Sequence, residues 1–258
     1  KKPARYLGNE WNVIKKDFSD NFISFALCFP DLYEVGMSNL GIRILYSLLN
    51  EQQDVICERV FHPDFDLMRM LYAKKIPIFS LESKRELKDF DFIGFSLAYE
   101  LLYTNVLNIL YLSNIPFFSS QREGNFPIII GGGISAFHPE PIADFFDLFV
   151  IGEAEEVILE LIAVYRDLKK KYKKDKIKKE FLHSIDHLAG VYIPSFYKPV
   201  YYSDGRIKEF SCLQKNAPIF IEKRYIKNLN LSFYPLKWLV PYVEIIHDRI
   251  SLELMRGC

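Results

Sequence analysis

The stretch FISFALCFPDLYEVGMSNLGIRILYSLLNEQ, residues 22–52, contains a strand pattern, a loop and a helix pattern in that order. Residues 22–30 form a short apolar run that ends at a proline, which is typical of a buried strand. Residues 39–52 place apolar side chains at helical spacing. A strand that passes through a short loop into a helix is the repeating unit of α/β folds.

The same alternation continues along the first two thirds of the chain. The sequence predicts strands over residues 55–61, 90–97, 126–133 and 147–152, a short strand or edge segment over 76–83, and helices over 64–75, 99–113, 139–146 and 153–173. Because helices connect successive strands, the pattern predicts a doubly wound parallel sheet of the Rossmann or flavodoxin type, with helices on both faces. Ligands of such sheets bind outside the carboxyl ends of the strands.

The pattern changes after residue 173. Residues 1–173 are predicted to form the α/β domain, and residues 174–240 a small α+β connector with a helix, a hairpin around a Ser-Asp-Gly turn and a linker. Residues 241–258 regain strand character, as expected for the first strand of another domain. The chain lacks an initial Met and stops directly after this pattern, so we expect a fragment that is cut at both ends.

Composition argues against several classes of protein. The chain has 33 basic and 33 acidic residues and a pI near 7.1, so no overall charge attracts it to nucleic acid or anionic membranes. The lysine-rich run at 169–179 is typical of a solvated helix end and loop. No apolar run reaches the roughly 18 residues that cross a bilayer. Cys28, Cys57, Cys212 and Cys258 lack the spacing of metal ligands, which favours a reducing cytoplasm over a disulfide framework.

Two glycine-containing loops follow predicted strands. Asp31 and Gly36 lie between a strand and a helix, where backbone N–H groups can bind a phosphate or a polar ligand tail. An ordinary turn explains both residues equally well. Gly131, Gly132 and Gly133 would let a flat or bulky ligand approach the backbone closely, or would simply form a tight turn. They do not fit the G-x-G-x-x-G pattern of dinucleotide-binding folds.

Polar side chains follow two other strands. Ser96, Tyr99 and Glu100 lie at a predicted strand-to-helix junction. Gly152 and Glu153 begin the motif GEAEE, which starts the long helix over 153–173. Acidic side chains there complement the helix dipole, which is a sufficient structural reason for them, and acid–base chemistry is the alternative.

The last residues, HDRISLELMRGC (247–258), combine a strand pattern with Arg-Gly-Cys. This segment resembles the first barrel strand of radical S-adenosylmethionine (radical SAM) enzymes where it enters their C-x-x-x-C-x-x-C loop, with Cys258 as the first cysteine. The phrases FPDLYEVGMSNLGIRILYSLLN, GFSLAYELLYTNVLNIL, IIIGGG and PEPIADFFDLFVIGEAEEVI are similar, in this order, to the cobalamin-binding-domain radical SAM family of largely unassigned function. The resemblance covers nearly the whole chain.

The resemblance implies cofactors whose binding site this chain does not contain in full. In such enzymes three cysteine thiolates hold a 4Fe–4S cluster, and the open iron binds S-adenosylmethionine. The full-length protein would then cleave S-adenosylmethionine reductively, for radical chemistry or for methyl transfer through cobalamin. With one of the three cysteines, this chain alone is not expected to be catalytic. Tyr99, Glu100, Gly152 and Glu153 would line the face toward its own C-terminal barrel.

The cobalamin fold has its own signature, D-x-H-x-x-G followed by a serine and a glycine pair. The residues that match it are Asp31, Tyr33, Gly36, Ser96, Gly131 and Gly132. Tyr33 stands where the cobalt-binding histidine would be, and a phenol that titrates near pH 10 is a poor cobalt ligand. The resemblance therefore implies cobalamin without a protein imidazole, its nucleotide tail inserted between sheet and helix. The alternatives are a docking domain that has lost the cofactor and, less in keeping with the motifs, a flavodoxin-like mononucleotide binder.

Overall fold

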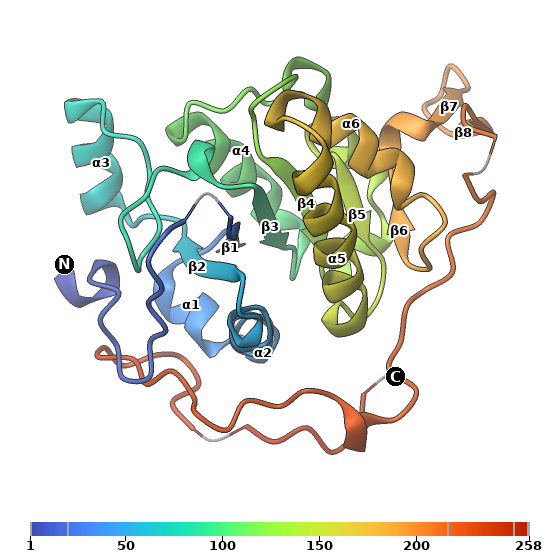
Figure 1. Ribbon diagram of the computed structural model, residues 1–258. Helices are drawn as coiled ribbons and strands as arrows, with labels where there is room; N and C mark the ends of the chain where they lie inside the picture. The colour runs from blue at the N-terminus through green and yellow to red at the C-terminus, as the bar shows by residue number, and fades with distance from the viewer. Residues whose placement is uncertain (1, 20, 216, 250, 257–258) are drawn as a thin grey trace.

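The structure, a computed structural model, describes residues 2–19, 21–215, 217–249 and 251–256. Within these ranges a six-stranded, mostly parallel sheet is flanked by helices (Figure 1), so the predicted α/β class is confirmed. Its strands are β1 Ile23–Phe29, β2 Val55–Phe61, β3 Phe92–Ser96, β4 Ile128–Gly132, β5 Leu148–Val150 and β6 Val191–Tyr192. The helices are α1 Tyr33–Ser38, α2 Leu40–Glu51, α3 Phe65–Lys74, α4 Tyr103–Leu112, α5 Glu155–Lys171 and α6 Lys174–Ser184.

The order of the strands creates one point where the chain changes direction across the sheet. The order is β2-β1-β3-β4-β5-β6, and β1 pairs in parallel with both β2 and β3. The connection after β1 therefore runs toward one edge, and the connection after β3 runs toward the other. In open α/β sheets the crevice at such a switch point is the usual ligand site.

Helices cover both faces of the sheet. Helix α2 packs against α5 on one face, and α4 lies over the other (Figure 1). All seven residues of β1 and all seven of β2 are buried, as expected for strands covered on both sides. Among the helices of the described ranges, none is both long and apolar enough to cross a membrane.

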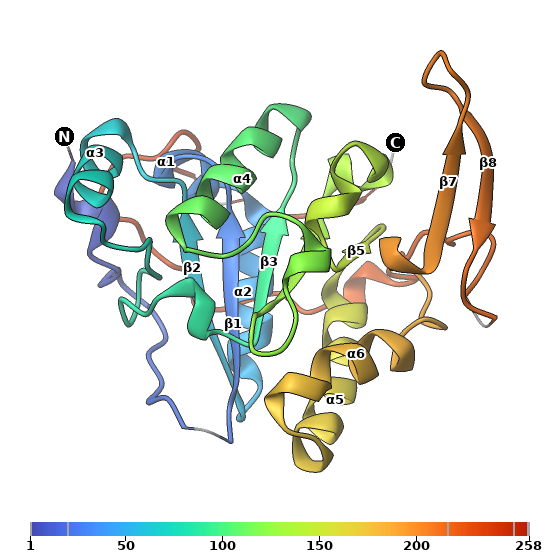
Figure 2. The same ribbon diagram turned by 90° about the horizontal axis from the view of Figure 1, so that it is seen from above.

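Several predicted elements differ in detail. Strand β6 pairs antiparallel with β5, so the sheet is not wholly parallel as predicted. The hairpin predicted around the Ser-Asp-Gly turn is confirmed as β7 Tyr197–Tyr201 and β8 Ile207–Cys212, and it projects from the body (Figure 2). The helix predicted over 139–146 is a 3₁₀ helix, Glu140–Phe145. The edge segment predicted over 76–83 makes a single bridge, between Phe79 and Glu86.

Helix α6 belongs to the packing of the sheet, although it follows residue 173. Its Phe181 is fully buried and contacts the ring of Phe92 in β3, with ring centroids 5.5 Å apart. The ring of Tyr165 in α5 lies 5.7 Å from the same side chain. The core of the α/β layer therefore includes residues of the predicted connector.

The C-terminal part of the chain forms a long strap, defined here as residues 217–249 and 251–256, that returns across the molecule (Figure 1). It bridges Gly152 at Arg224 and Trp11 at Val240. The strand predicted over 241–258 is not formed in residues 241–249 and 251–256. The physical reason is that an extended segment needs a neighbouring strand to satisfy its N–H and C=O groups, and no ladder reaches these residues.

Candidate functional site

The carboxyl ends of β1 and β3 meet at the switch point, where Asp31 and Tyr99 lie in hydrogen-bond contact. The Tyr99 hydroxyl donates to Oδ2 of Asp31, while Oδ1 accepts from the N–H of Leu32 at 2.7 Å. The hydrogen bond to Asp31 raises the pKa of Tyr99 to about 12, with burial and the carboxylate charge acting in the same direction. Two residues predicted from separate loops therefore form one polar pair at the edge of the sheet.

His62 joins this edge from the end of β2, and the sequence analysis did not single it out. Its backbone N–H donates to the carbonyl of Asp31 at 2.9 Å, and its Nε2 lies 2.7 Å from Nδ2 of Asn108 in α4. Asn108 in turn accepts from the hydroxyl of Tyr72 at 2.6 Å. Its position in the sequence was the signal that could have identified it, because His62 lies just beyond the end of a strand, as Asp31 and Tyr99 do.

His62 makes the stability of the protein depend on pH. Burial lowers the pKa of His62 below its usual value near 6.5, although the Asp31 charge opposes the shift. The unfolded chain therefore binds a proton at a higher pH than the folded chain does. We expect the free energy of unfolding to fall as pH decreases from 6.5 to the folded pKa, by up to about 1.4 kcal/mol per pH unit, and to level off below it.

Urea denaturation between pH 5 and 7.5, at about half-unit steps, measures this effect. His62→Gln should remove the part of the slope that this imidazole causes. His187→Gln is the matched control, because the side chain of His187 is 68% exposed. Equal slopes for His62→Gln and the parent chain would show that His62 titrates alike in both states.

The glycines at the end of β4 and directly after it serve the packing of the protein itself. A methyl group on Gly131 would lie 2.6 Å from the ring of Phe149 and 3.1 Å from that of Phe146, and both rings are fully buried. The N–H of Leu97 donates to the carbonyl of Gly132 at 2.6 Å, which joins the loops after β3 and β4. A methyl on Gly133 would lie 2.7 Å from the carbonyl oxygen of Leu97. Gly131 and Gly133 thus have structural reasons to be glycine.

The side chain of Tyr33 lies in the core, and Gly36 is packed against it. The Tyr33 hydroxyl donates to Oε1 of Glu10 at 2.8 Å, and its ring contacts Phe61, with centroids 5.3 Å apart. Burial, together with the charge of Glu10, raises the pKa of Tyr33 well above its usual value. A methyl on Gly36 would lie 2.2 Å from the Phe61 ring. Tyr33 is therefore an interior hydrogen-bond donor and is not presented to a ligand.

These contacts bear on whether the tail of a corrinoid would fit between the sheet and the helices. The space beside Gly131 and Gly36 holds phenylalanine rings of this chain, and Tyr33 already has a buried partner. Ser96 is half-buried at the end of β3, next to the loop that closes onto Gly132. The described residues therefore do not fit a nucleotide tail placed between sheet and helix.

The cysteines of the described residues do not fit an iron–sulfur cluster. Cys28 in β1 and Cys57 in β2 are fully buried, and burial raises the pKa of both thiols, which disfavours the thiolate that binds metal. Cys212 is half-buried in the hairpin. Within the described ranges no three potential metal-binding side chains lie together. Cys258, the predicted cluster ligand, lies outside the described residues.

The remaining predicted residues lie along the same edge. Glu100 is exposed at the start of a 3₁₀ helix, Glu100–Leu102. Gly152 follows β5 with φ of +109°, and its loop pairs with Arg224 of the strap. Glu153 accepts from the N–H of Ile226 at 2.5 Å. The edge thus carries polar contacts at one end and anchors the strap at the other.

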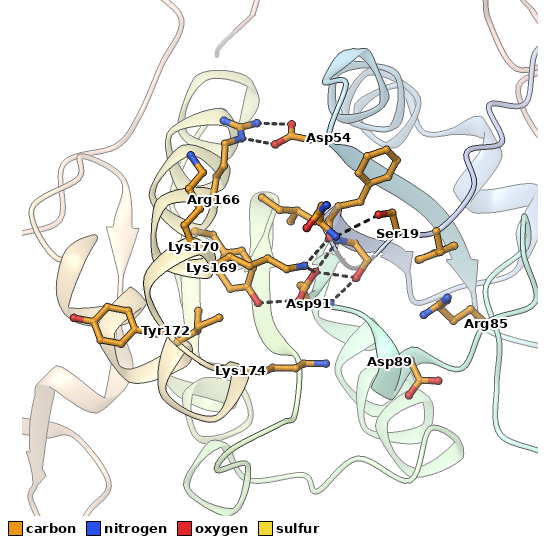
Figure 3. A pocket seen from close by; sticks show the side chains of 17 residues that line it. Ser19, Asp54, Arg85, Asp89, Asp91, Arg166, Lys169, Lys170, Tyr172 and Lys174 are labelled. Atoms are coloured by element: carbon orange, nitrogen blue, oxygen red, sulfur yellow. Dashed lines mark hydrogen bonds and ion pairs between the residues drawn. The ribbon is translucent and has the colours of Figure 1, made fainter.

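A hollow of about 810 Å³ lies at the opposite, amino edge of the sheet (Figure 3). Several of its charged side chains are paired within the protein. Arg166 binds Asp54 at 2.7 Å, and Lys169 lies 3.2 Å from Asp91 at the start of β3. Because these pairs join α5 to the sheet, this hollow has a structural explanation.

Comparison with known proteins adds three findings. A family profile for the N-terminal region of radical SAM proteins matches residues 41–194. An uncharacterized protein of Methanocaldococcus jannaschii is 27% identical over 160 residues, which cover 60% of this chain and 30% of that protein. No solved structure matches the chain. The chain therefore spans less than a third of the length of this relative.

Proposed function

Since the chain belongs to the family of N-terminal regions of radical SAM proteins, we propose that it is the docking domain of a radical SAM enzyme. Its carboxyl edge faces a catalytic barrel that lies beyond residue 258. The barrel holds the 4Fe–4S cluster and S-adenosylmethionine, and cleaves the latter reductively for radical chemistry. The domain itself inserts no cobalamin tail. This choice is supported by one observation: Tyr33, Gly36 and Gly131 are packed against other residues of this chain, where a cofactor tail would have to lie.

The surface of the carboxyl edge supports docking. Leu101 and Ile134 are 81% and 77% exposed, and Phe137 is 43% exposed, in the loops that follow β3 and β4. Apolar side chains gathered at one functional edge are typical of an interaction surface. The strap leads the chain to the same edge, since Arg256 contacts Glu155 at the start of α5. We therefore assign this surface to the barrel of the same protein.

A titration with hydroxocobalamin tests the absence of an inserted cofactor. The visible bands should not shift with the parent chain. They should also not shift with Tyr33→His, because that side chain points at Glu10 in the interior and not at a ligand. A saturable band shift with the parent chain would overturn the docking assignment in favour of a cobalamin-binding domain.

The catalytic part is tested in the longer protein that contains this chain. After anaerobic reconstitution with iron and sulfide, the reduced protein should form deoxyadenosine from S-adenosylmethionine. Cys258→Ala should lower this rate by about 100-fold or more, because two cysteines hold a cluster poorly. Cys212→Ala is the control, since this half-buried residue lies in strand β8 and not in the C-terminal Arg-Gly-Cys motif. Equal loss in both variants, or in neither, would contradict the assignment of Cys258.

A further inference from the structure

The motif GEAEE at the start of α5 contacts the strap near its C-terminal end, at Arg256. Nη1 of Arg256 lies 2.5 Å from Oε1 of Glu155 and 3.8 Å from Oε2 of Glu153. Nε of the same guanidinium donates to Glu253 at 2.9 Å. The side chain of Arg256 is only 18% exposed. It is thus enclosed by three carboxylates.

Glu153 also holds the strap at a second place. Its backbone N–H donates to the carbonyl of Arg224 at 2.9 Å, and its Oε2 accepts from the N–H of Ile226 at 2.5 Å. The N–H of Arg224 completes the pairing by donating to the carbonyl of Ile151 at 2.9 Å. One loop at the carboxyl edge therefore binds the strap both at its beginning and near its end.

The glutamates of this motif have different partners, which separates two explanations for them. Glu155 and Glu156 both lie in the first turn of α5, so both complement the helix dipole to a similar extent. Of these two, Glu155 binds Arg256, whereas Glu156 binds Arg224 at 2.9 Å. A role in the dipole alone would not distinguish the two glutamates.

We propose that Glu155, with Glu153, is a positioning residue that docks Arg256 and thereby sets where the chain leaves the carboxyl edge, two residues before Cys258. The effect of this docking on the reaction of the enzyme rests on the proposed function, in which Cys258 is a cluster ligand. The docking itself requires only the described contacts. It predicts that the motif GEAEE aligns the start of the cluster loop with the domain edge.

Electron paramagnetic resonance of a nitroxide on Cys258 tests the docking. The measurement uses the full 258-residue chain with Cys212→Ser, because Cys28 and Cys57 are buried and do not label. With the parent chain the spectrum should contain an immobile component. Glu155→Gln should increase the mobile fraction about fivefold, because a hydrogen-bonded charge pair that fixes the arginine is lost. Glu156→Gln, the matched control, should leave the spectrum unchanged.

Reversal of the charges distinguishes positioning from a general loss of structure. Glu155→Arg alone should release the label, and Glu155→Arg combined with Arg256→Glu should restore the immobile component. The circular dichroism and thermal midpoint should change little in all variants. Equal mobility in the parent chain, Glu155→Gln and Glu156→Gln would overturn the proposal. These spectra need neither iron nor S-adenosylmethionine, so a failed docking test and a failed cluster test are distinct results.

Discussion

Arg59→Met is expected to lower the free energy of unfolding by about 3–5 kcal/mol, the cost of removing one partner from a buried ion pair. Arg59 is fully buried in β2. Its Nη2 binds Oε2 of Glu10 at 2.9 Å, and its Nε binds Oε1 of Glu82 at 2.7 Å. Without the guanidinium, two buried carboxylates lose their counter-charge, and they cannot both reach water without unfolding this edge.

The expected loss of stability in Arg59→Met comes from two carboxylates left without a partner. A second set of variants tests this cause. Adding Glu10→Gln and Glu82→Gln to Arg59→Met should recover a large part of the stability, because neutral amides are cheaper to bury than carboxylates. Arg69→Met is the control, since Arg69 is exposed on α3. Urea denaturation of the four proteins gives the comparison. A loss under about 1 kcal/mol for Arg59→Met would mean that water already reaches this cluster.

Gly152→Ala is the second substitution with a large expected effect, and it acts on the strap. The added methyl would lie 2.0 Å from the carbonyl oxygen of Arg224. Its φ of +109° adds about 1–3 kcal/mol of backbone strain for alanine. The hydrogen bonds between this loop and Arg224 and Ile226 would break. We expect the strap to leave the start of α5 while the sheet stays folded.

Hydrogen exchange followed by mass spectrometry would detect this local release. Peptides that cover residues 222–228 should lose protection in Gly152→Ala, whereas peptides from β1 and β3 should keep it. Gly205→Ala is the matched control: its φ is +85°, but nothing lies within 4 Å of the added methyl. Unchanged protection of 222–228 in Gly152→Ala would contradict the pairing of this loop with the strap.

The predicted strands and helices of the α/β layer came largely from periodicity and are found within a few residues of their expected bounds. Such patterns report burial, which local sequence determines well in strands like β1 and β2. Strand β6 was not predicted to join the main sheet, because the alternation around Val191 and Tyr192 indicates extended backbone without identifying the neighbouring strand. Its antiparallel partner β5 was chosen by tertiary packing.

The candidate site was predictable only in part, because sequence shows where a residue lies along the chain and not which way its side chain points. Asp31 and Tyr99 were placed correctly at strand ends, and they meet. Tyr33 follows the same strand but turns inward to Glu10. The pairing of Glu155 with Arg256 joins residues about 100 positions apart, beyond the reach of any local pattern.

The strap gives the folding reaction an expected order. Nδ2 of Asn12 binds the carbonyl of Trp238 across a sequence separation of 226 residues, and Trp11 pairs with Val240 beside it. Closing so long a loop costs chain entropy, and few contacts at the point of closure offset this cost. We therefore expect these contacts to form after the sheet has condensed. Substitutions at Arg224 or Trp238 should therefore have φ-values near zero in folding kinetics, leaving the folding rate unchanged and accelerating unfolding.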